Sequence, residues 1–496
     1  MGTISKNFSY HEFEHSDIAK EERITNVITS AEVRDSIKCL VDNLLQPLRD
    51  AIKKPLKISS GYRCPQLNSH YKVGGSPTSQ HCFDAETEIL TDKGWKKYDE
   101  IKDDDIVLSY NVEADVIEPT RIDSIIIRHH SGYMMGFDTK QIDVLTTDKH
   151  RMLVKYENHK YVRKNTKNIS PEGQKYFDSL KTDNDKWHIE RAEDVFGKRR
   201  RYKSAGRSVA WNNADILFYK MCMAVIADGY FCYKSELKSV AIGFRFKKER
   251  KCIQLEELLI NLGWHYTKSL DKNGVWNYYL RSEYGNKIQS VIGKDKHIPY
   301  DVLSFGSEKL RELVLYYALY DGCGDKRDKC NGVNIGTIIK HNADMLQAMC
   351  ALSDMRCVCT KHARSQYEIM GQKGVGKDYY MLSINLKRNE CRVNEDRYHK
   401  KSYDGIVWCV NNKNTTVIVR RNGKVSIQGN CLGEAADVWC ATMTPYELAC
   451  KVVELDLPFD QLVLYPGFVH LSHKKSGAQR KQILYNKSYK GQKIKL

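Results

Sequence analysis

The feature that most constrains this chain is a pair of boundaries, one before Cys82 and one after Asn430. The segment between them begins with cysteine, ends with asparagine and is followed at once by another cysteine, Cys431. Removing that segment would join residues 79–81 to residues 431–437 and give the continuous string S-Q-H-C-L-G-E-A-A-D. The boundaries therefore predict a precursor in which a long insert, residues 82–430, interrupts a second protein.

Length, charge and hydropathy limit what the two parts can be. A chain of 496 residues exceeds the size that one compact core usually reaches, so several domains are expected. The net charge of +17 suits either a polyanionic partner such as nucleic acid or simple solubility. The start has no apolar export segment and no run of about 18 apolar residues occurs, which predicts a cytoplasmic protein with no membrane partner. The sixteen cysteines lack paired zinc-ribbon spacing, which favours reduced thiols.

The joined string resembles the H-x-x-G-x-A-x-D signature of D-Ala-D-Ala carboxypeptidase-like zinc peptidases, the family of some phage endolysins. Two further stretches carry the resemblance, S-G-Y-R at residues 60–63 and the aromatic-x-His ending at residues 468–470. The resemblance implies that His81, Asp437 and His470 bind Zn²⁺ after joining, with a fourth position left for water. It implies that Arg63 faces the substrate's carboxylate or the developing oxyanion, and that the substrate is a peptidoglycan peptide.

One position departs from the peptidase pattern. The family's general base is a glutamate three residues before the last histidine, and this chain has Gly467 there. Glu434, Asp460 and His473 are the candidates to replace it. Zinc binding is thus a firmer expectation than hydrolysis, and a metal- or wall-binding protein of low peptidase activity stays open.

The insert resembles an intein, a self-splicing element built on the all-β Hint (hedgehog/intein) fold. Its opening at residues 82–91, T-x-x-H at Thr147 to His150, and a closing block at residues 407–425 carry the resemblance. By this resemblance, Cys82 attacks the preceding carbonyl to form a thioester, while Thr147 and His150 hold and protonate the scissile amide. Cys431 then attacks the thioester, and Asn430 cyclises to release the insert.

The intein resemblance also has a gap. Inteins usually carry histidine just before the final asparagine, and here that residue is Gly429. The usual helper for asparagine cyclisation is absent, so another group must serve. Slow release, or cleavage at the first boundary as a side reaction, is an expected consequence.

The middle of the insert resembles a LAGLIDADG homing endonuclease. Two apolar runs end in Asp-Gly, at Asp228 and Asp321, and a K-x-I-P block beginning at Lys296 lies between them. The resemblance implies two packed helices whose aspartates share Mg²⁺ ions over double-stranded DNA, with Lys296 stabilising charge at the phosphate. Residues 240–247 read as a strand for the major groove, and the basic run 198–203 as a linker or a DNA-contacting arm.

These readings combine into one multidomain fold class: an all-β Hint module with an inserted α+β endonuclease, flanked by two halves of an α+β zinc peptidase. The predicted boundaries are 1–81 and 431–496 for the peptidase, 82–205 and 391–430 for the Hint module, and 206–390 for the endonuclease. Two alternatives remain. One is a DNA-binding, maturase-like protein with incidental flanks, and the other is a splicing element that carries an inactive nuclease.

Overall fold

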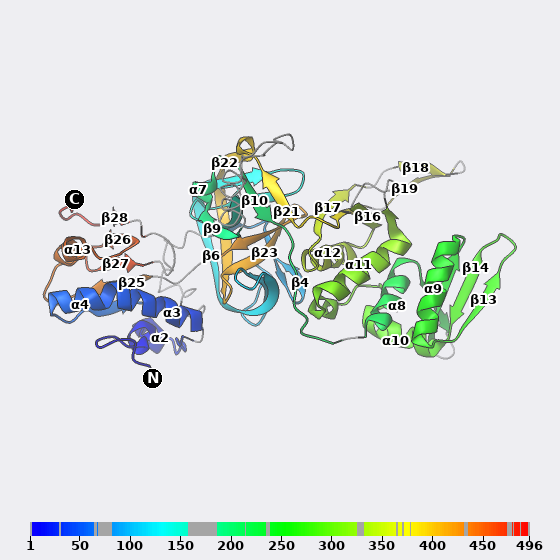
Figure 1. The fold of residues 1–496 in the computed structure, drawn as a ribbon, viewed down its shortest axis with the longest axis horizontal. Coiled ribbons are helices and arrows are strands. Elements are labelled where there is room, and N and C mark those ends of the chain that lie inside the picture. Colours follow the sequence, from blue (N-terminus) through cyan, green and yellow to red (C-terminus); the bar gives the residue numbers. More distant parts are fainter. Residues whose placement is uncertain are drawn as a thin grey trace, which may run out of the picture.

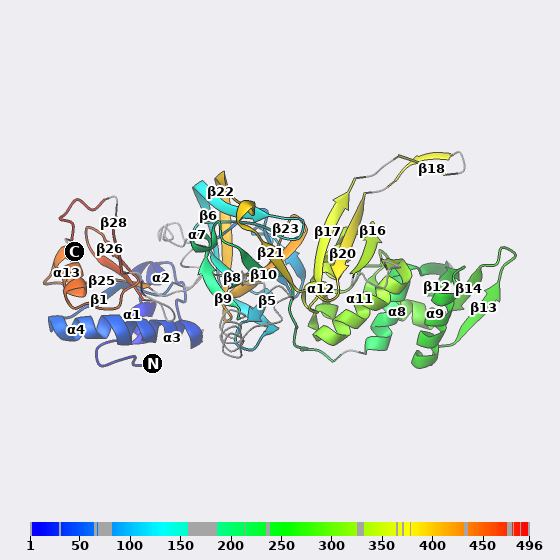
Figure 2. The same cartoon turned by 45° about the horizontal axis from the view of Figure 1, so that its top comes forward.

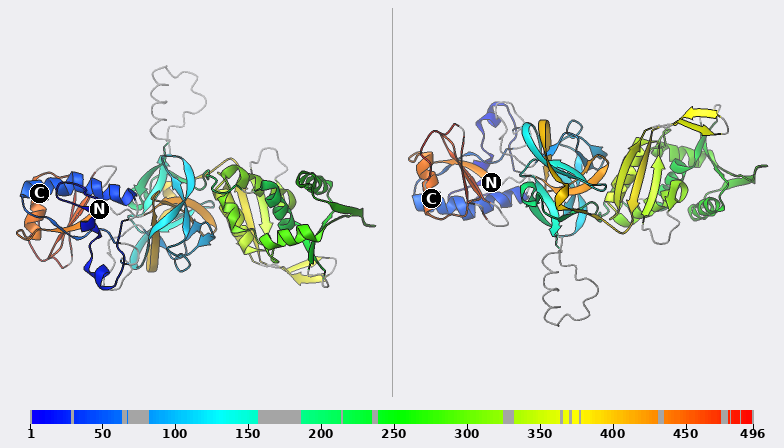
Figure 3. Two further views of the ribbon diagram at one scale, coloured as in Figure 1. Left: turned by 90° about the horizontal axis from the view of Figure 1, so that it is seen from below. Right: turned by 90° about the horizontal axis from the view of Figure 1, so that it is seen from above.

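The computed structural model describes residues 2–28, 31–63, 67, 82–156, 186–213, 215–234, 239–324, 332–363, 366–369, 372–376, 378–430, 435–473, 479, 481–486 and 488–494. They form three bodies in a row, and both chain termini lie in the first (Figure 1). The order is the same in the turned view of Figure 2 and in the views from below and above in Figure 3. Within the described residues, no helix is long and apolar enough to cross a membrane.

The first body, the flank domain, is built from both ends of the chain. Its elements are α1 (Tyr10–Glu14), α2 (Asp17–Glu21), α3 (Ala31–Leu40), a π-helical turn (Val41–Leu45), α4 (Gln46–Ile52), β1 (Lys57–Ser60), β25 (Ala435–Trp439), α13 (Pro445–Glu454), β26 (Gln461–Leu464), β27 (Val469–Ser472) and β28 (Gln482–Tyr485). The sheet order is β1-β25-β27-β26-β28. The helix expected from the periodic apolar residues 33–48 and the helix expected at 446–455 are both confirmed.

The two flanks share one core although the insert separates them in sequence. Strand β1 of the first flank pairs with β25 of the second, with Ile58 opposite Val438. Leu44 and Leu48 are buried in the same apolar cluster as Leu448 and other second-flank side chains. Because burial of apolar surface drives folding, the flanks fold as one domain before any joining.

The central β module contains the two ends of the insert. Its elements are β2 (Phe83–Asp84), β3 (Glu88–Thr91), β4 (Gly94–Lys96), β5 (Ile106–Asn111), β6 (Val116–Asp138), β7 (Asp143–Thr146), β8 (Arg151–Tyr156), β9 (His188–Arg191), α7 (Ala192–Val195), β10 (Arg200–Lys203), β21 (Glu390–Val393), a 3-10 turn (Glu395–Arg397), β22 (Tyr398–Asn412), β23 (Thr416–Arg421) and β24 (Lys424–Gly429). Strands β6 and β22 form its long antiparallel pair. The paired ends put residue 82 and residue 430 in one module.

The basic run 198–203 was predicted as a linker or a DNA-contacting arm, and that prediction is wrong. Arg200–Lys203 is strand β10, which lies between β8 and β21. Arg200 pairs with Glu190 at 2.9 Å, and Arg201 pairs with Glu390 at 2.9 Å. Neutralised by these carboxylates within a sheet, the run is part of the module's own packing.

The third body, the repeat domain, comprises α8 (Ile216–Ala227), β11 (Tyr230–Lys234), β12 (Ser239–Phe246), α9 (Glu249–Leu262), β13 (Tyr266–Leu270), β14 (Trp276–Leu280), α10 (Ser282–Ile292), a 3-10 turn (Tyr300–Ser304), α11 (Ser307–Asp321), β15 (Gly322–Gly324), β16 (Gly332–Thr337), α12 (Lys340–Ala351), β17 (Arg356–His362), β18 (Gln366–Ile369), β19 (Gln372–Val375) and β20 (Tyr379–Asn385). The apolar helices predicted to end in Asp-Gly are α8 and α11, and the strand predicted at 240–247 is β12.

This domain repeats one arrangement twice. Each half runs helix, hairpin, helix, hairpin, and the sheet orders β11-β12-β14-β13 and β15-β16-β20-β17 correspond strand for strand. Helices α8 and α11 begin the two halves and pack against each other. Equivalent helix ends from the two halves are thereby brought together, which positions the candidate carboxylates.

The repeat domain is joined to the central module through the β23–β24 hairpin. Lys424 pairs with Val358 of β17, so one sheet of thirteen strands runs through both bodies. At the hairpin turn, Gly423 has a φ of +71°, and a Cβ there would lie 2.0 Å from the Cys359 carbonyl oxygen. The turn therefore requires glycine both for its backbone angle and for this close approach.

A buried arginine reinforces this junction. Arg420 is 4% exposed, its guanidinium donates to both carboxylate oxygens of Glu88 at 2.6 and 2.7 Å, and it also donates to Asp344 of α12 at 2.6 Å. A buried guanidinium is tolerated only when such partners compensate its charge. One of these partners comes from the repeat domain.

Candidate functional site

The first end of the insert is held by the T-x-x-H segment. The Cys82 backbone N–H donates to Thr147 Oγ1 at 3.0 Å, and the Thr147 N–H donates to the Cys82 carbonyl oxygen, also at 3.0 Å. Both residues are buried. The nitrogen of the bond that splicing would break is therefore fixed beside a hydroxyl group.

His150 lies next to the same end. Its imidazole is buried, and the ring centroid is 4.3 Å from that of Phe83, the residue after Cys82. The His150 N–H donates to the Thr147 carbonyl oxygen at 3.1 Å, which makes the segment a tight turn. A titratable ring in this position suits proton transfer to a leaving amide nitrogen.

The second end of the insert comes to the same segment. Asn430 follows β24 and is completely buried, and its N–H donates to the Thr415 carbonyl oxygen at 2.9 Å. Its own carbonyl oxygen accepts a hydrogen bond from Arg151 Nη1 at 3.1 Å. The side-chain amide atoms of Asn430 are buried without a hydrogen-bond partner among the described residues.

The position before Asn430 has no room for a side chain. A Cβ built on Gly429 would lie 2.7 Å from Arg151 Cβ and 2.9 Å from the Arg151 carbonyl oxygen. Such distances are shorter than van der Waals contact. The glycine that departs from the intein pattern is thus required by the strand that carries Arg151.

A salt-bridge network fixes the two ends of the module against each other. Arg421 of β23 donates to Asp84 at 3.0 Å and to Asp143 at 2.6 Å. Asp84 is two residues after Cys82 in the sequence, and Asp143 is the first residue of β7, the strand that ends just before Thr147. Burial and both carboxylates act on the Arg421 guanidinium, and the net effect raises its pKa.

In the repeat domain, the two predicted aspartates lie at equivalent helix ends. Asp228 caps α8 and Asp321 is the last residue of α11. Glycine is required where α11 ends, because a Cβ on Gly322 would lie 2.3 Å from the carbonyl oxygen of Ala318 in the last turn of the same helix. Loss of surrounding water and the nearby charge of Asp228 raise the pKa of Asp321 to about 6. The Asp321 residue is nevertheless exposed to solvent.

Two lysines approach this pair of carboxylates. Lys296 Nζ donates to the Gly229 carbonyl oxygen at 2.8 Å, and burial lowers the pKa of Lys296 although both aspartates oppose that shift. Lys251 of α9 forms an ion pair with Asp228. Carboxylate oxygens suit Mg²⁺, and a cation bound between two neighbouring negative charges would relieve their mutual repulsion. The residues fit the predicted ion.

In the flank domain, two of the three predicted zinc ligands are neighbours. Asp437 of β25 is paired in register with His470 of β27, and His470 Nδ1 lies 2.7 Å from Asp437 Oδ1. An imidazole nitrogen and a carboxylate oxygen are both suitable zinc donors, so these two residues fit the ion. His81 and Cys431 lie outside the described residues, and no group of three potential ligands occurs within the described part.

The other predicted peptidase residues lie in distinct places. Arg63 Nη2 donates to Ser60 Oγ at 2.9 Å, at the end of β1 opposite Asp437. Among the candidate bases, Asp460 is buried and 3.7 Å from Arg191 of the central module. His473 is also buried, with Nδ1 bonded to the Pro458 carbonyl oxygen. Both are committed to structural contacts, and Glu434 lies outside the described residues.

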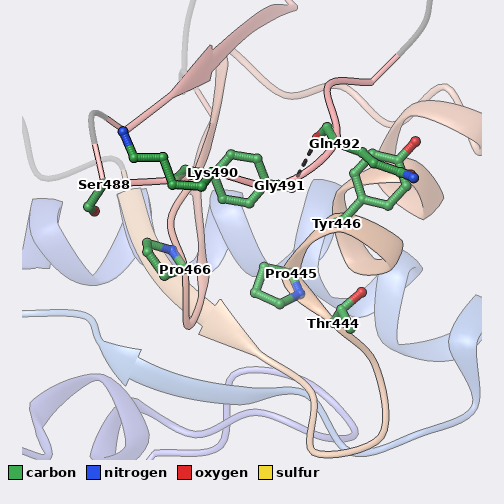
Figure 4. Close-up of a pocket in the computed structure, with 9 residues that line it drawn as sticks. Thr444, Pro445, Tyr446, Pro466, Ser488, Lys490, Gly491 and Gln492 are labelled. Atoms are coloured by element: carbon green, nitrogen blue, oxygen red, sulfur yellow. Dashed lines mark hydrogen bonds between the residues drawn. The ribbon is translucent and has the colours of Figure 1, made fainter.

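A pocket of the flank domain lies apart from these ligands. It is lined by the start of α13, by Pro466 and by residues 488–492, with a volume of about 480 Å³ (Figure 4). A hydrogen bond from Tyr489 Oη to the Gln492 carbonyl oxygen closes one side. None of the predicted site residues lines it.

Sequence reasoning missed two residues of these sites, Arg151 and Lys251. Arg151 directly follows the T-x-x-H histidine, but nothing in its position indicates contact with a residue near 430. Lys251 belongs to the basic start of α9, E-R-K, which reads as an ordinary exposed helix end. In both cases only the fold brings the cation to its partner.

A comparison with protein families finds the model described as Peptidase M15, which matches residues 6–94. The match covers the first flank and ends shortly after the start of the insert. It agrees with the peptidase resemblance of this flank.

Among curated proteins, ribonucleoside-diphosphate reductase subunit beta of Aquifex aeolicus (strain VF5) is 26% identical over 373 residues. The match includes 71% of this chain and 50% of that protein, so the chain spans about half the length of the curated relative it matches. Because the two flanks are short, most of the matched segment must lie within the insert.

Among solved structures, about a third of this chain is similar to two homing endonucleases and to a DUF199/WhiA protein, each at low sequence identity. I-DmoI in complex with DNA and Mn is 14% identical over 35% of this chain and 92% of that chain, with a TM-score of 0.23. The homing endonuclease I-WcaI bound to its DNA recognition sequence is 11% identical over 36% and 78%, with a TM-score of 0.22. Full-length DUF199/WhiA from Thermatoga maritima is 9% identical over 36% and 53%, with a TM-score of 0.23.

Proposed function

We propose that residues 82–430 excise themselves and join His81 to Cys431. The observation that carries this proposal is that one short segment, Thr147 to Arg151, contacts both ends of the insert: Thr147 bonds Cys82 at 3.0 Å, and Arg151 bonds Asn430 at 3.1 Å. A reaction that cuts two distant peptide bonds and joins their outer sides requires this proximity. The shared core of the flanks also favours joining, since it keeps them together.

In the first step, Cys82 Sγ attacks the carbonyl carbon of residue 81. A carbon–sulfur bond forms, the carbon–nitrogen bond to Cys82 breaks, and the nitrogen takes a proton. Thr147 holds that nitrogen, and His150 supplies the proton. Cys431 then attacks the thioester through its own thiol, Asn430 cyclises, and a sulfur-to-nitrogen shift restores an ordinary peptide bond. A reducing, cytoplasmic compartment suits these thiols.

The similarity to a reductase subunit supports an insert that is separable from its host. A peptidase-like flank and a reductase have no common chemistry, yet most of the matched segment falls within residues 82–430. A mobile element present in two unrelated proteins explains a match of this kind.

We further propose that the repeat domain cuts double-stranded DNA at one site in the uninterrupted gene. Asp228 and Asp321 would hold Mg²⁺, which activates water and stabilises the leaving oxygen. Lys296 and Lys251 interact with these carboxylates and would stabilise negative charge at the phosphate. Strand β12 supplies Arg245, an exposed cation for the DNA backbone.

For the joined flanks we propose a zinc peptidase that acts on peptidoglycan peptides. Asp437 and His470 are already paired before joining, and His81 would complete the ligand set. The bound ion would supply Lewis acidity and an activated water. A metal- or wall-binding protein of low activity is the second candidate, favoured by Gly467 and by the buried contacts of Asp460 and His473.

The decisive experiment is the intact mass of freshly expressed protein. Excision should convert the 57.4 kDa chain into products of about 40 and about 17 kDa, in proportion to residue number. The Cys82→Ala, Asn430→Ala double variant is the control and should stay whole. A single stable species of 57.4 kDa from the unaltered chain would contradict splicing.

The other activities have separate tests. Cleavage of a plasmid that carries the uninterrupted gene, with magnesium and with EDTA, tests the nuclease. Zinc content and release of D-Ala or cross-link peptides by the 17 kDa product test the peptidase. Zinc bound without peptide release would favour the second candidate.

A further inference from the structure

We propose that Arg151 is a catalytic residue of asparagine cyclisation and that it replaces the histidine missing at position 429. The inference rests on the proposed splicing function and extends it. It assigns a chemical task to a contact that the T-x-x-H motif does not include.

The contact is directed at a reacting atom. Arg151 Nη1 donates to the carbonyl oxygen of Asn430, the carbonyl whose carbon must be attacked for the insert to leave. Asn430 is fully buried, and its N–H is held by the Thr415 carbonyl oxygen, which fixes the peptide orientation. In such a site a charge-assisted hydrogen bond is stronger than one in water.

Cyclisation develops charge where the guanidinium points. Asn430 Nδ2 attacks the carbonyl carbon, a nitrogen–carbon bond forms, and negative charge gathers on the carbonyl oxygen. The carbon–nitrogen bond to Cys431 then breaks, and the proton lost from Nδ2 ends on the released amine. Arginine stays protonated throughout, so Arg151 stabilises the oxyanion and transfers no proton.

The attacking amide is poorly tethered. Both polar atoms of the Asn430 side chain are buried and have no hydrogen-bond partner in the described part of the chain. An amide held in strong hydrogen bonds would have to break them before attack. The site thus combines a fixed, polarised carbonyl with a side chain that no hydrogen bond from a described residue holds away from it.

Gly429 is explained by the same geometry. The strand that delivers Arg151 passes so close that a Cβ at position 429 would overlap Arg151 Cβ and its carbonyl oxygen. With the strand in this place, position 429 has no room for the histidine side chain. In this chain Arg151 would activate the carbonyl group that the histidine at this position usually activates in inteins.

The test isolates each end of the insert. In a Cys82→Ala background, only cleavage after Asn430 can occur, and Arg151→Met should slow it about 10²- to 10³-fold, as loss of an oxyanion donor does. Arg151→Lys keeps the charge but loses the planar fork, so it should retain intermediate activity. Arg121→Met, which removes an exposed arginine from β6 of the same module, is the matched control and should match the background.

A second background separates catalysis from folding. In Asn430→Ala protein, dithiothreitol should release the first flank by attacking the thioester at Cys82. Arg151→Met should change this release only a few-fold, because Arg151 contacts the other end. Equal losses at both ends would assign Arg151 a structural role and overturn the proposal.

The pH profile gives a readout that packing alone would not change. Arg151→His in the Cys82→Ala background should cleave faster below about pH 6.5, because only the protonated imidazolium donates to the oxyanion with full charge. Unchanged cleavage after Asn430 in Arg151→Met would also overturn the proposal. Absence of cleavage at both ends of the unaltered chain would remove the splicing proposal and this inference with it.

Discussion

The centre at the ends of the insert and the centre of the repeat domain handle charge in opposite ways. Cys82, His150 and Asn430 are each fully buried. Asp228 and Asp321, by contrast, are reached by solvent and accompanied by Lys251 and Lys296. The proposed splicing would act once on the chain's own backbone, so the first centre would need no entrance. The proposed DNA cleavage would have to admit a polyanion and a metal ion, which suits charges that stay at the surface.

The largest expected effect separates the two centres. Asp228→Asn and Asp321→Asn should each reduce plasmid cleavage by more than about 10³-fold, since each removes a metal-binding carboxylate without changing side-chain size. Excision measured by intact mass should be unchanged in both. Loss of excision in either variant would show that the two centres are not independent.

A smaller effect is expected from restoring the usual intein residue. Gly429→His should slow cleavage after Asn430, because overpacking against Arg151 costs about 1–3 kcal/mol and moves the guanidinium from the carbonyl. Quantified gel bands over time would give the rate. Faster cleavage in this variant would mean that the space beside Arg151 opens easily. Plasmid cleavage, measured in parallel, serves as the control for folding.

The pH dependence of plasmid cleavage tests whether Asp321 acts in its ionised form. The pKa of Asp321 is raised to about 6, so this carboxyl is ionised above that pH and increasingly neutral below it. Magnesium binding needs the ionised form, and cleavage should fall about tenfold per pH unit below 6 and level off above it. The profile should be measured at saturating DNA. Asp321→Glu should keep a falling acid limb, and a flat profile between pH 5 and 7 would contradict the shift.

The smallest effect concerns DNA affinity alone. Arg245 on β12 is 58% exposed and pairs with Asp271 at 3.2 Å. If it contacts phosphate, Arg245→Ala should reduce the slope of log affinity against log salt by about 0.9. Fluorescence anisotropy with a labelled duplex measures this slope. Arg121→Met, on the central β module, should leave the slope unchanged.

Much of this arrangement could be predicted from the sequence where the pattern is local. The apolar runs that end in Asp-Gly predicted α8 and α11, because all the residues that indicate such a helix and its end lie within one short stretch of sequence. The basic run that forms β10 could not be read in this way. Its carboxylate partners, Glu190 and Glu390, lie on other strands, and an unpaired row of cations resembles a surface arm.

The same limit applies to the candidate sites. Motifs predicted Cys82, Thr147 and Asn430 as site residues because the proposed chemistry depends on residue type at a fixed place. Arg151 has no motif position for its contact, which joins a strand start to a residue at the far end of the insert. Motifs also predicted Asp437 and His470 as zinc ligands. The sequence could not predict the contact between them, because it depends on the register of β25 and β27.

The junction at the β23–β24 hairpin has a consequence for inheritance. Strand β24 pairs with β17, Gly423 contacts the Cys359 backbone, and Arg420 shares its charge with Asp344. A descendant that lost the repeat domain by clean deletion would expose the edge of β24 and leave a buried cation short of one carboxylate. Loss of the repeat domain would therefore require compensating changes in the central module, whereas replacement of Asp228 or Asp321 would leave the junction intact.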